Sequence, residues 1–352
     1  MTSEQRISAF IKLGKEIRQT FDNQNTELNI RQEQLLQLCE RMHHSNAWFT
    51  FENTRHALLG IAAMLEENSL RNWYANYATA FETEKMLSVG VIMAGNIPAV
   101  GFHDFMCILL SGNILSAKLS SNDLVLIPAL AAMLCAIEPE FANRVHFTEN
   151  RLPKIDAIIA TGSNNSSRYF DYYFSKYPNI IRKNRTSVAV LSGDESHQEL
   201  QSLCEDVFRY FGLGCRNVSC LFVPEDFKPD PFYEAAEAWA DIYNHQKYNN
   251  NYTYNKSVYL VNSIPHFDNN FLILREDNSL HPPLGVINFR RYKDIDAVKQ
   301  ELENLKNEIQ CVIASPLSGI PSLPFGASQQ PGPEDYADGV DTMAFLASIP
   351  AQ

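Results

Sequence analysis

Cys215 is the residue of this chain whose sequence neighbours best suit a nucleophile. It follows Gly212-Leu213-Gly214 and precedes Arg216. Glycines allow the backbone to bend and a substrate to approach the sulfur, and a neighbouring cation favours the reactive thiolate. A thiolate placed in this way could attack an electrophilic carbon. The alternative is a buried loop cysteine, which is the commoner fate of this residue type. We expect the six other cysteines to be inert.

Two polar side chains follow predicted strands at positions suited to bind a ligand. Asn96 lies in Ala94-Gly95-Asn96-Ile97-Pro98, where its amide could stabilise an oxyanion. The alternative for Asn96 is a cap on the helix that follows. Lys118 ends the next predicted strand and precedes Leu119-Ser120-Ser121, so that it could contact a ribose or a phosphate. The alternative for Lys118 is a lysine that faces solvent.

Two further runs of small residues suit tight loops. The run Thr161-Gly162-Ser163-Asn164-Asn165 leads into a predicted helix. Backbone N–H groups at a helix N-terminus can bind a pyrophosphate. This run matches neither of the common glycine-rich nucleotide motifs, and its alternative is an N-cap turn. Pro324-Phe325-Gly326 predicts by itself only a turn.

Alternating strands and helices must position these loops. Residues 1–80 carry helical apolar stripes and predict a helical N-terminal segment. The alternation that follows predicts a doubly wound parallel sheet, in which ligands bind at the carboxyl ends of the strands. The predicted strands are 89–94, 114–118, 145–147 and 157–160, and the predicted helices are 98–111 and 123–137.

A second alternating series begins near residue 187, so that we place the boundary between two domains at Arg185. Residues 244–255 are rich in Asn and Tyr and predict a polar loop. Residues 316–335 are rich in Pro, Gly and Ser and predict a surface loop or a crossing segment. The predicted strands of this series are 188–191, 219–223, 257–261, 271–274, 286–289 and 311–314, and the predicted helices are 195–211 and 231–243.

Composition excludes several classes of protein. The chain has 352 residues, of which 45% are apolar and 20% charged, as in an ordinary globular protein of about two domains. Its net charge of −12 argues against a broad nucleic-acid surface. The seven scattered cysteines form no CxxC pair, so we expect reduced thiols and no metal site. Because no signal-peptide core or long apolar run occurs, we expect no transmembrane segment and a cytoplasmic protein.

The order of these motifs resembles the aldehyde dehydrogenase superfamily over roughly residues 86–346. The resemblance implies an α/β fold in which a helical segment and a Rossmann-type dinucleotide-binding domain occupy residues 1–185. An α/β catalytic domain then occupies residues 186–352. The motifs that carry the resemblance are an Asn-x-Pro loop at Asn96, Lys118 some 22 residues later, Thr-Gly-Ser at 161–163, Gly-x-x-Cys at 212–215 and Pro-Phe-Gly at 324–326.

Within the superfamily the chain is most similar to the acyl-CoA reductase, or fatty-acid reductase, group related to the reductase of the bacterial luciferase system. Ordinary aldehyde dehydrogenases carry a general-base Glu in a Glu-Leu-Gly-Gly segment, whereas Ile181–Arg185 has no carboxylate. Without that base, water deacylates a thioester slowly, which suits an acyl group that arrives on, or leaves to, a thiol. The usual Glu-x-Phe-Gly-Pro motif is replaced near Leu280–Gly285, where His281 lies.

The resemblance implies a role for each candidate residue. Cys215 attacks the carbonyl carbon, while the Asn96 amide and the Cys215 backbone N–H hold the oxyanion. Lys118, Ser120 and Ser121 contact the adenosine ribose or its phosphate. Because Ser121 stands where NAD-preferring relatives often carry Glu, NADPH is favoured over NADH. The residues expected near the pyrophosphate or the nicotinamide are Thr161, Gly162 and Ser163.

The resulting hypothesis is the NAD(P)H-dependent reduction of an acyl thioester to a fatty aldehyde through a thioester on Cys215. The acyl donor is acyl-CoA or an acyl-carrier protein. Two alternatives stay open: an aldehyde dehydrogenase that makes an acid, and a non-catalytic relative that acts as a binding subunit. The resemblance also implies an acyltransferase or acyl-activating protein as a partner, and a homo-oligomer.

Overall fold

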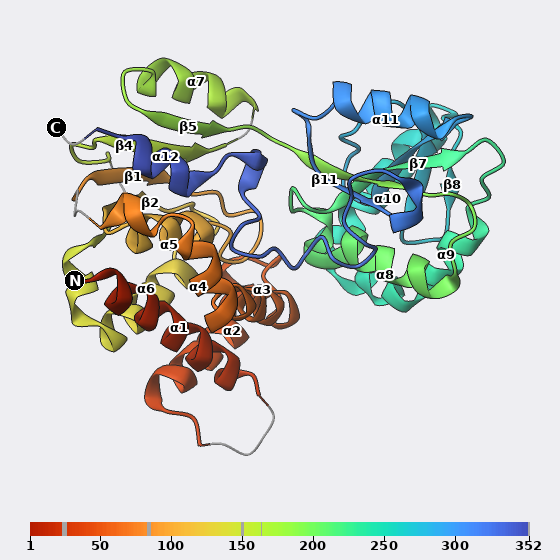
Figure 1. Cartoon of the computed structure of the whole chain (residues 1–352). Coiled ribbons are helices and arrows are strands. Elements are labelled where there is room, and N and C mark those ends of the chain that lie inside the picture. Colours follow the sequence, from red (N-terminus) through yellow and green to blue (C-terminus); the bar gives the residue numbers. More distant parts are fainter. Residues whose placement is uncertain (23–26, 83–85, 149–150, 163, 351–352) are drawn as a thin grey trace. The chain divides into compact units, whose positions relative to one another are not determined.

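The computed structural model describes residues 1–22, 27–82, 86–148, 151–162 and 164–350. It divides the chain into two compact units (Figure 1). Unit 1 contains Met1–Asn184 together with Pro331–Gln352, and unit 2 contains Arg185–Gln330. The first crossing between units follows Asn184. The expected second domain, 186–352, is wrong in its last part, because the chain returns to unit 1 at Pro331.

Unit 1 begins with the helical segment that the sequence predicts. A capping box between Thr2 and Gln5 starts its first helix. The helices of unit 1 are α1 (Ser3–Thr20), α2 (Ile30–Ser45), α3 (Phe51–Met64), α4 (Glu67–Ala75), α5 (Phe102–Leu110), α6 (Leu126–Ile137), α7 (Asn164–Phe174) and α12 (Thr342–Ser348), with 3₁₀ turns η1 (Ala78–Phe81), η2 (Pro139–Asn143) and η6 (Ala337–Gly339). Its strands are β1 (Ser88–Ile92), β2 (Ile114–Lys118), β3 (Val145–Thr148), β4 (Ala157–Thr161) and β5 (Asn179–Arg182).

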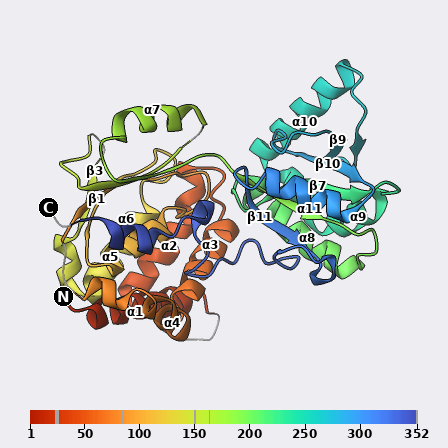
Figure 2. The same ribbon diagram turned by 45° about the horizontal axis from the view of Figure 1, so that its top comes forward.

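The strands of unit 1 form one parallel sheet in the order β3-β2-β1-β4-β5. Side chains alternate between its two faces. Val89 and Val91 belong to the larger core, whereas Ile158 and Ala160 pack with the Phe170 side chain of α7. Helices α5 and α6 lie on one face of the sheet and α7 on the other (Figures 1 and 2). The apolar runs of β1 and β4 match strands that are buried on both faces.

Aromatic side chains hold the returning segment in unit 1. Trp73 donates through Nε1 to the Tyr336 hydroxyl at 2.9 Å, and the Tyr77 and Tyr336 hydroxyls lie 2.8 Å apart. Tyr77 donates to the Asp341 carboxylate at 2.6 Å. Helix α12 follows, and its Met343 side chain is fully buried in the unit 1 core. These pairs are 259 to 264 positions apart in sequence, and therefore local patterns did not predict them.

Unit 2 has a six-stranded sheet in the order β11-β6-β7-β10-β9-β8, which is parallel except for β8. Its helices are α8 (His197–Phe208), α9 (Asp230–Ala236), α10 (Gln246–Val261) and α11 (Ile295–Asn304), with 3₁₀ turns η3 (Arg209–Gly212), η4 (Glu237–Asn244) and η5 (Pro316–Ser318). Its strands are β6 (Thr186–Val190), β7 (Val218–Pro224), β8 (Phe267–Asp268), β9 (Ile273–Glu276), β10 (Val286–Tyr292) and β11 (Ile309–Ala314).

Helices cover both faces of the unit 2 sheet. The α11 side chains Val298 and Leu302 pack with Val188 of β6 and Phe222 of β7. Helices α8 and α9 lie on the other face (Figure 1). A capping box between Ser196 and the Glu199 side chain also starts α8.

The segment 244–261 corrects two sequence predictions. After Asn244, which ends η4, residues 246–261 form the continuous helix α10, rather than a polar loop over 244–255 and a strand over 257–261. Its buried side chains are Tyr248, Tyr252, Asn255 and Tyr259, which follow helical spacing. Aromatic and amide groups make this buried stripe instead of aliphatic residues, so that composition concealed the helix. Tyr252 is therefore buried on a helix and bonded to Asp268, rather than placed on a loop.

Two smaller differences concern unit 1. Helix α5 begins at Phe102, later than the predicted 98, because the chain first makes a turn in which Ala99 has φ 52°. The sequence did not predict β5, which is four residues long and ends in a charged side chain. Among the described residues, no helix combines the length and the apolar character that crossing a bilayer requires.

Candidate active site

Unit 1 brings three of the predicted loops to one edge of its sheet. Lys118 is the last residue of β2, and Thr161 is the last residue of β4. Asn96 follows the end of β1, the strand that lies between them. The chain proceeds from β1 to β2 and β3 on one side, and it then continues at β4 on the other side of β1. The gap between β1 and β4 is thus the point where strand order reverses, which is where open α/β sheets bind ligands.

The loops after β1 and β2 touch each other. A Cβ atom on Gly95 would lie 2.6 Å from Ser120 Oγ and 2.7 Å from Ser120 Cβ, so this contact requires glycine. Buried Asp123 joins the loops further, because it accepts from Ala99 N at 2.9 Å and from Leu126 N at 3.2 Å. Burial raises the pKa of the Asp123 carboxyl, although these backbone donors oppose the shift.

The Asn96 side chain is exposed on this loop. The alternative that Asn96 caps the following helix is wrong, because the N-cap of α5 is Gly101 and no side chain caps that helix. Lys118 is also exposed, at the last position of β2. Within the described part of the chain, no carboxylate pairs with the Lys118 ammonium group. This position suits contact with an anion and equally suits a solvent-facing lysine. Ser121 is exposed on the same loop.

Gly162 allows the chain to turn closely from β4 into α7. A Cβ atom there would lie 2.8 Å from the Phe170 ring and 2.9 Å from Ser166 Cβ. The Gly162 N–H donates to Arg182 O at 3.3 Å, which ties this turn to β5. Ser163, the third predicted residue of the loop, lies outside the described residues.

Arg182 is an important residue at this edge that the sequence analysis did not assign. Its guanidinium donates to the Asp104 carboxylate at 2.5 and 2.8 Å and to Thr342 Oγ1 at 3.2 Å. Both charged side chains are 7% exposed. Burial alone lowers the pKa of Arg182, and the Asp104 carboxylate reverses this effect and raises it. The segment Ile181–Arg185, which contains no general base, thus supplies the buried guanidinium of Arg182, and this group links β5 to α5 and α12.

Cys215 lies in unit 2, in the turn that precedes β7, and its side chain is partly exposed. Its carbonyl accepts from buried Ser187 Oγ at 3.0 Å. Asn217 shapes the turn from inside, because its Oδ1 accepts from Gly214 N at 2.8 Å. The Asn217 amide donates to Arg209 O at 2.8 Å and so connects the turn to the end of α8. The cysteine is therefore presented by a turn with fixed backbone positions.

The thiols of the chain differ in their exposure. A thiol reacts as its thiolate, which burial disfavours. Burial raises the pKa of three thiols to about 12, namely Cys39, Cys204 and Cys220. It also raises the pKa of Cys107 and of partly exposed Cys135.

The Pro-Phe-Gly motif, for which the sequence predicted only a turn, reaches the Cys215 turn. Buried Asp206 on α8 accepts from Gly326 N at 2.7 Å and from Ser328 N at 2.9 Å. Arg216 donates through Nε to Ser328 O at 2.6 Å. In the sequence, only the place of the Pro-Phe-Gly motif in the order of the family motifs pointed to this segment. Nothing in the sequence indicated that the buried Asp206 carboxylate binds it.

His281 is exposed in the connection between β9 and β10. Its backbone N–H donates to Ser279 Oγ at 3.2 Å. The neighbouring Leu280 carbonyl accepts from Ser219 Oγ at 2.6 Å, which places this connection beside the start of β7. These contacts involve the backbone of the connection and give the imidazole no defined role.

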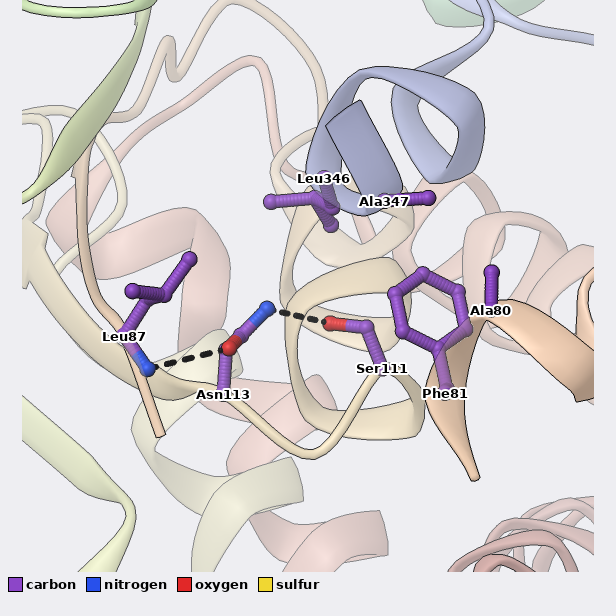
Figure 3. Close-up of a pocket in the computed structure, with 7 residues that line it drawn as sticks. All are labelled: Ala80, Phe81, Leu87, Ser111, Asn113, Leu346 and Ala347. Atoms are coloured by element: carbon purple, nitrogen blue, oxygen red, sulfur yellow. Dashed lines mark hydrogen bonds between the residues drawn. The ribbon is translucent and has the colours of Figure 1, made fainter. Parts of the chain in front are cut away.

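A small pocket of unit 1 lies away from the predicted residues (Figure 3). The Asn113 side chain accepts from Leu87 N at 3.1 Å and donates to Ser111 Oγ at 2.9 Å. Leu87 and Asn113 precede β1 and β2, so the pocket is at the amino end of the sheet, opposite the three loops. Its polar groups bond one another and its other lining side chains are apolar, so we assign it no catalytic role. Among the described residues, no cluster of three potential metal ligands occurs.

Comparisons with solved structures show the aldehyde dehydrogenase fold. Aldehyde dehydrogenase 21 from Physcomitrella patens, in complex with the reaction product succinate, aligns with TM-score 0.64 and 12% identity over 89% of this chain and 73% of that chain. The NADP complex of glyceraldehyde-3-phosphate dehydrogenase from Bacillus halodurans aligns with TM-score 0.58 and 13% identity over 89% and 74%. The NAD⁺ complex of aldehyde dehydrogenase from Bacillus cereus aligns with TM-score 0.57 and 13% identity over 89% and 72%.

Sequence comparison gives the family. No curated protein matches the chain by sequence. The profile of the acyl-CoA reductase (LuxC) family matches residues 2–248, which include the loops of unit 1 and the Cys215 turn. This family and this fold indicate an oxidoreductase that acts on aldehyde or acyl substrates. The chain belongs to the acyl-CoA reductase (LuxC) family.

Proposed function

We propose that this protein reduces an acyl thioester to an aldehyde with NADPH, through an acyl group carried on Cys215. The observation that carries the proposal is the environment of this thiol. Cys215 is partly exposed in a turn whose backbone is held at Gly214, Ser187 and Asn217. Burial raises the pKa of five other thiols, and the family profile covers the Cys215 position.

The chemistry assigned to the protein groups is acyl transfer. The Cys215 thiolate attacks the carbonyl carbon of the thioester, and the bond to the donor sulfur breaks as the donor thiol leaves. We assign the oxyanion contacts to the Cys215 backbone N–H and the Asn96 amide, the donors that the family resemblance names. The hydride that reduces the acyl group would come from a bound nicotinamide. Collapse of the hemithioacetal on Cys215 then releases the aldehyde and restores the thiolate.

The edge of the unit 1 sheet fits a dinucleotide. Its β1 and β4 loops flank the point where strand order reverses, and Gly162 keeps the β4 turn compact. Exposed Lys118 supplies a cation at the end of β2, and Ser121 supplies an uncharged hydroxyl. Structures of the same fold hold NADP or NAD⁺. We propose NADPH because Ser121 carries no charge that would repel a 2′-phosphate.

A substitution at Ser121 tests the cofactor. Ser121→Glu places a carboxylate where we expect the 2′-phosphate, so NADPH should bind more weakly while NADH binding changes little. Ser121→Gln is the matched uncharged control. Titrations of the nicotinamide fluorescence measure both affinities. Equal affinity of wild type and Ser121→Glu for NADPH would contradict the assignment.

Intact-protein mass spectrometry tests the acyl-enzyme. The wild type should gain the mass of one acyl group from at least one member of a series of acyl-CoAs, and NADPH should discharge it. Cys215→Ala should gain none, whereas Cys135→Ala, which removes the other partly exposed thiol named above, should behave as wild type. If the wild type gains no acyl group from any donor while it still binds nucleotide, the proposal is wrong.

The same experiment separates the two alternatives. An enzyme that makes a free acid would lose the acyl group to water without NADPH. Against this alternative, Ile181–Arg185 contains no carboxylate, and Arg182 is engaged with Asp104. A binding subunit without activity would bind nucleotide and gain no acyl group. Replacing acyl-CoA with an acylated carrier protein in this assay tests the protein-bound donor.

A further inference from the structure

Asp206 is a buried carboxylate to which the proposed reaction gives no role. It lies near the end of α8 and is 0% exposed. Within the described part of the chain, no cation pairs with it. Its two oxygens instead accept from Gly326 N at 2.7 Å and from Ser328 N at 2.9 Å. Burying a carboxylate without a cation is costly, and burial raises the pKa of Asp206 accordingly. A carboxylate buried at such a cost is typical of one that fixes the backbone groups to which it is bonded.

A ring of hydrogen bonds connects Asp206 to both sides of the Cys215 turn. On one side, the Asn217 amide donates to the Asp206 carbonyl at 3.0 Å, and Asn217 Oδ1 accepts from Gly214 N. On the other side, Arg216 Nε donates at 2.6 Å to the carbonyl of Ser328, the residue whose N–H the Asp206 carboxylate holds. Cys215 lies between these residues in sequence. The ring therefore fixes the chain immediately before and after the nucleophile.

The backbone between α8 and the turn explains why such fixing is needed. Tyr210 and Phe211 have φ 54° and 59°, in the left-handed region that bulky side chains rarely adopt. Such a residue is strained and persists only where its surroundings hold it. The Asn217 side chain bridges this strained segment. Its amide donates to Asp206 O, which precedes the segment, and to Arg209 O, which lies at the start of the segment.

We propose that Asp206 is a positioning residue for the Cys215 nucleophile. Its carboxylate fixes the Gly326–Ser328 loop, and that loop, through Ser328 O, fixes Arg216. Its carbonyl fixes Asn217. The sulfur and the backbone N–H of Cys215 thereby keep one orientation toward the acyl carbon. This inference rests on the proposed function of Cys215 as the acylated nucleophile.

Asp206→Asn tests this role, since it preserves shape but presents an NH₂ group to one of the two backbone donors. Single-turnover acylation by acyl-CoA should slow by roughly 100-fold, the usual effect of misplacing a reacting group by about 1 Å. The KM for acyl-CoA should change little. Alkylation of Cys215 by iodoacetamide, which demands little orientation, should stay within about threefold of wild type. A merely structural role would change neither rate or change both together.

Asp268→Asn is the matched control. This carboxylate is also in unit 2, but it lies on the edge strand β8, which β10 and β9 separate from β7, and it bonds Tyr252 and Lys256. Acylation should stay close to the wild-type rate in this variant.

A second variant reaches the same loop without altering a buried charge. Gly326 has φ 86°, and a Cβ atom there would lie 3.1 Å from Ser202 Cβ. Gly326→Ala should therefore displace the loop and slow acylation by roughly tenfold or more, again with little change in alkylation. This variant decides the question if Asp206→Asn does not fold. Normal acylation in the folded Asp206 and Gly326 variants would overturn the positioning role alone. Failure of the wild type to acylate would overturn the proposed function, and the positioning role with it.

Discussion

Asp104→Asn should destabilise unit 1 far more than the loss of an exposed ion pair does. The Asp104 carboxylate accepts two hydrogen bonds from Arg182, at 2.5 and 2.8 Å, and both side chains are 7% exposed. Asparagine is nearly isosteric but leaves the guanidinium buried without its counterion. Breaking one side of a buried pair costs about 3–5 kcal/mol. For a unit of this size each kcal/mol shifts the melting temperature by roughly 2–4 °C, so we expect a loss near 10 °C.

Thermal and urea unfolding, followed by tryptophan fluorescence, measure this loss in the full chain. The control is Glu4→Gln, which removes the carboxylate from a pair with Arg71 at 2.8 Å whose side chains are 64% and 37% exposed. That pair should contribute no more than about 1 kcal/mol. The double variant Asp104→Asn/Arg182→Gln should lose less than the sum of its single variants, because no unpaired charge remains. An unfolding free-energy loss in Asp104→Asn no larger than that in Glu4→Gln would contradict the assigned contribution of this buried pair.

Three further outcomes follow. His103 Nε2 lies 2.9 Å from Pro333 O, and burial lowers the pKa of the His103 imidazole below 6.5. As the pH falls, His103 is therefore protonated in the unfolded chain before it is protonated in the folded chain. At pH values under about 6.5, the free energy of unfolding should therefore fall by up to about 1.4 kcal/mol per pH unit. Urea unfolding at pH 7.5 and 5.5 measures this fall, which should be smaller in His103→Gln. Iodoacetamide at pH 8 should label Cys215 well before the three thiols with pKa about 12, of which roughly one in 10⁴ is ionised; equal labelling in peptide mass maps would contradict this. Gly95→Ala should push the β1 loop away from Ser120 and weaken NADPH binding by tenfold or more, whereas Gly60→Ala, where added carbon meets nothing within 4 Å, should bind normally in the same titration.

The sequence predicted the parts of unit 1 whose causes are local. Strands β1, β2 and β4 are short apolar runs, and parallel strands covered on both faces require such runs. Once the strands alternate with helices, the topology brings their carboxyl ends to one edge. The sequence alone therefore predicts that the loops that hold Asn96, Lys118 and Thr161 lie together.

The remaining features depend on partners that are distant in sequence. Arg182 pairs with Asp104 across 78 positions, and Asp206 bonds Ser328 across 122. A charged residue gives no sign of such a partner in its own neighbourhood. Helix α10 escaped detection for a different reason, since its buried stripe is made of tyrosines and Asn255, which resemble a polar loop in composition. The structural role of the Pro-Phe-Gly motif likewise became evident only from its hydrogen bond to Asp206.

The return of the chain to unit 1 has a consequence for synthesis on the ribosome. Domains generally fold as units while the chain emerges from its N-terminus. Unit 2 is continuous from Arg185 to Gln330, so that all of its residues become available before Tyr336 and Met343 leave the ribosome. Unit 1, although its synthesis starts first, still lacks the Tyr336 hydroxyl that bonds Trp73 and Tyr77, and the threonine that bonds Arg182. It also lacks the buried core side chains of Met343, Leu346 and Ile349. Unit 2 can therefore complete its fold before unit 1, although unit 1 is translated first. The core of unit 1 stays incomplete until unit 2, which is inserted into it, has been synthesised.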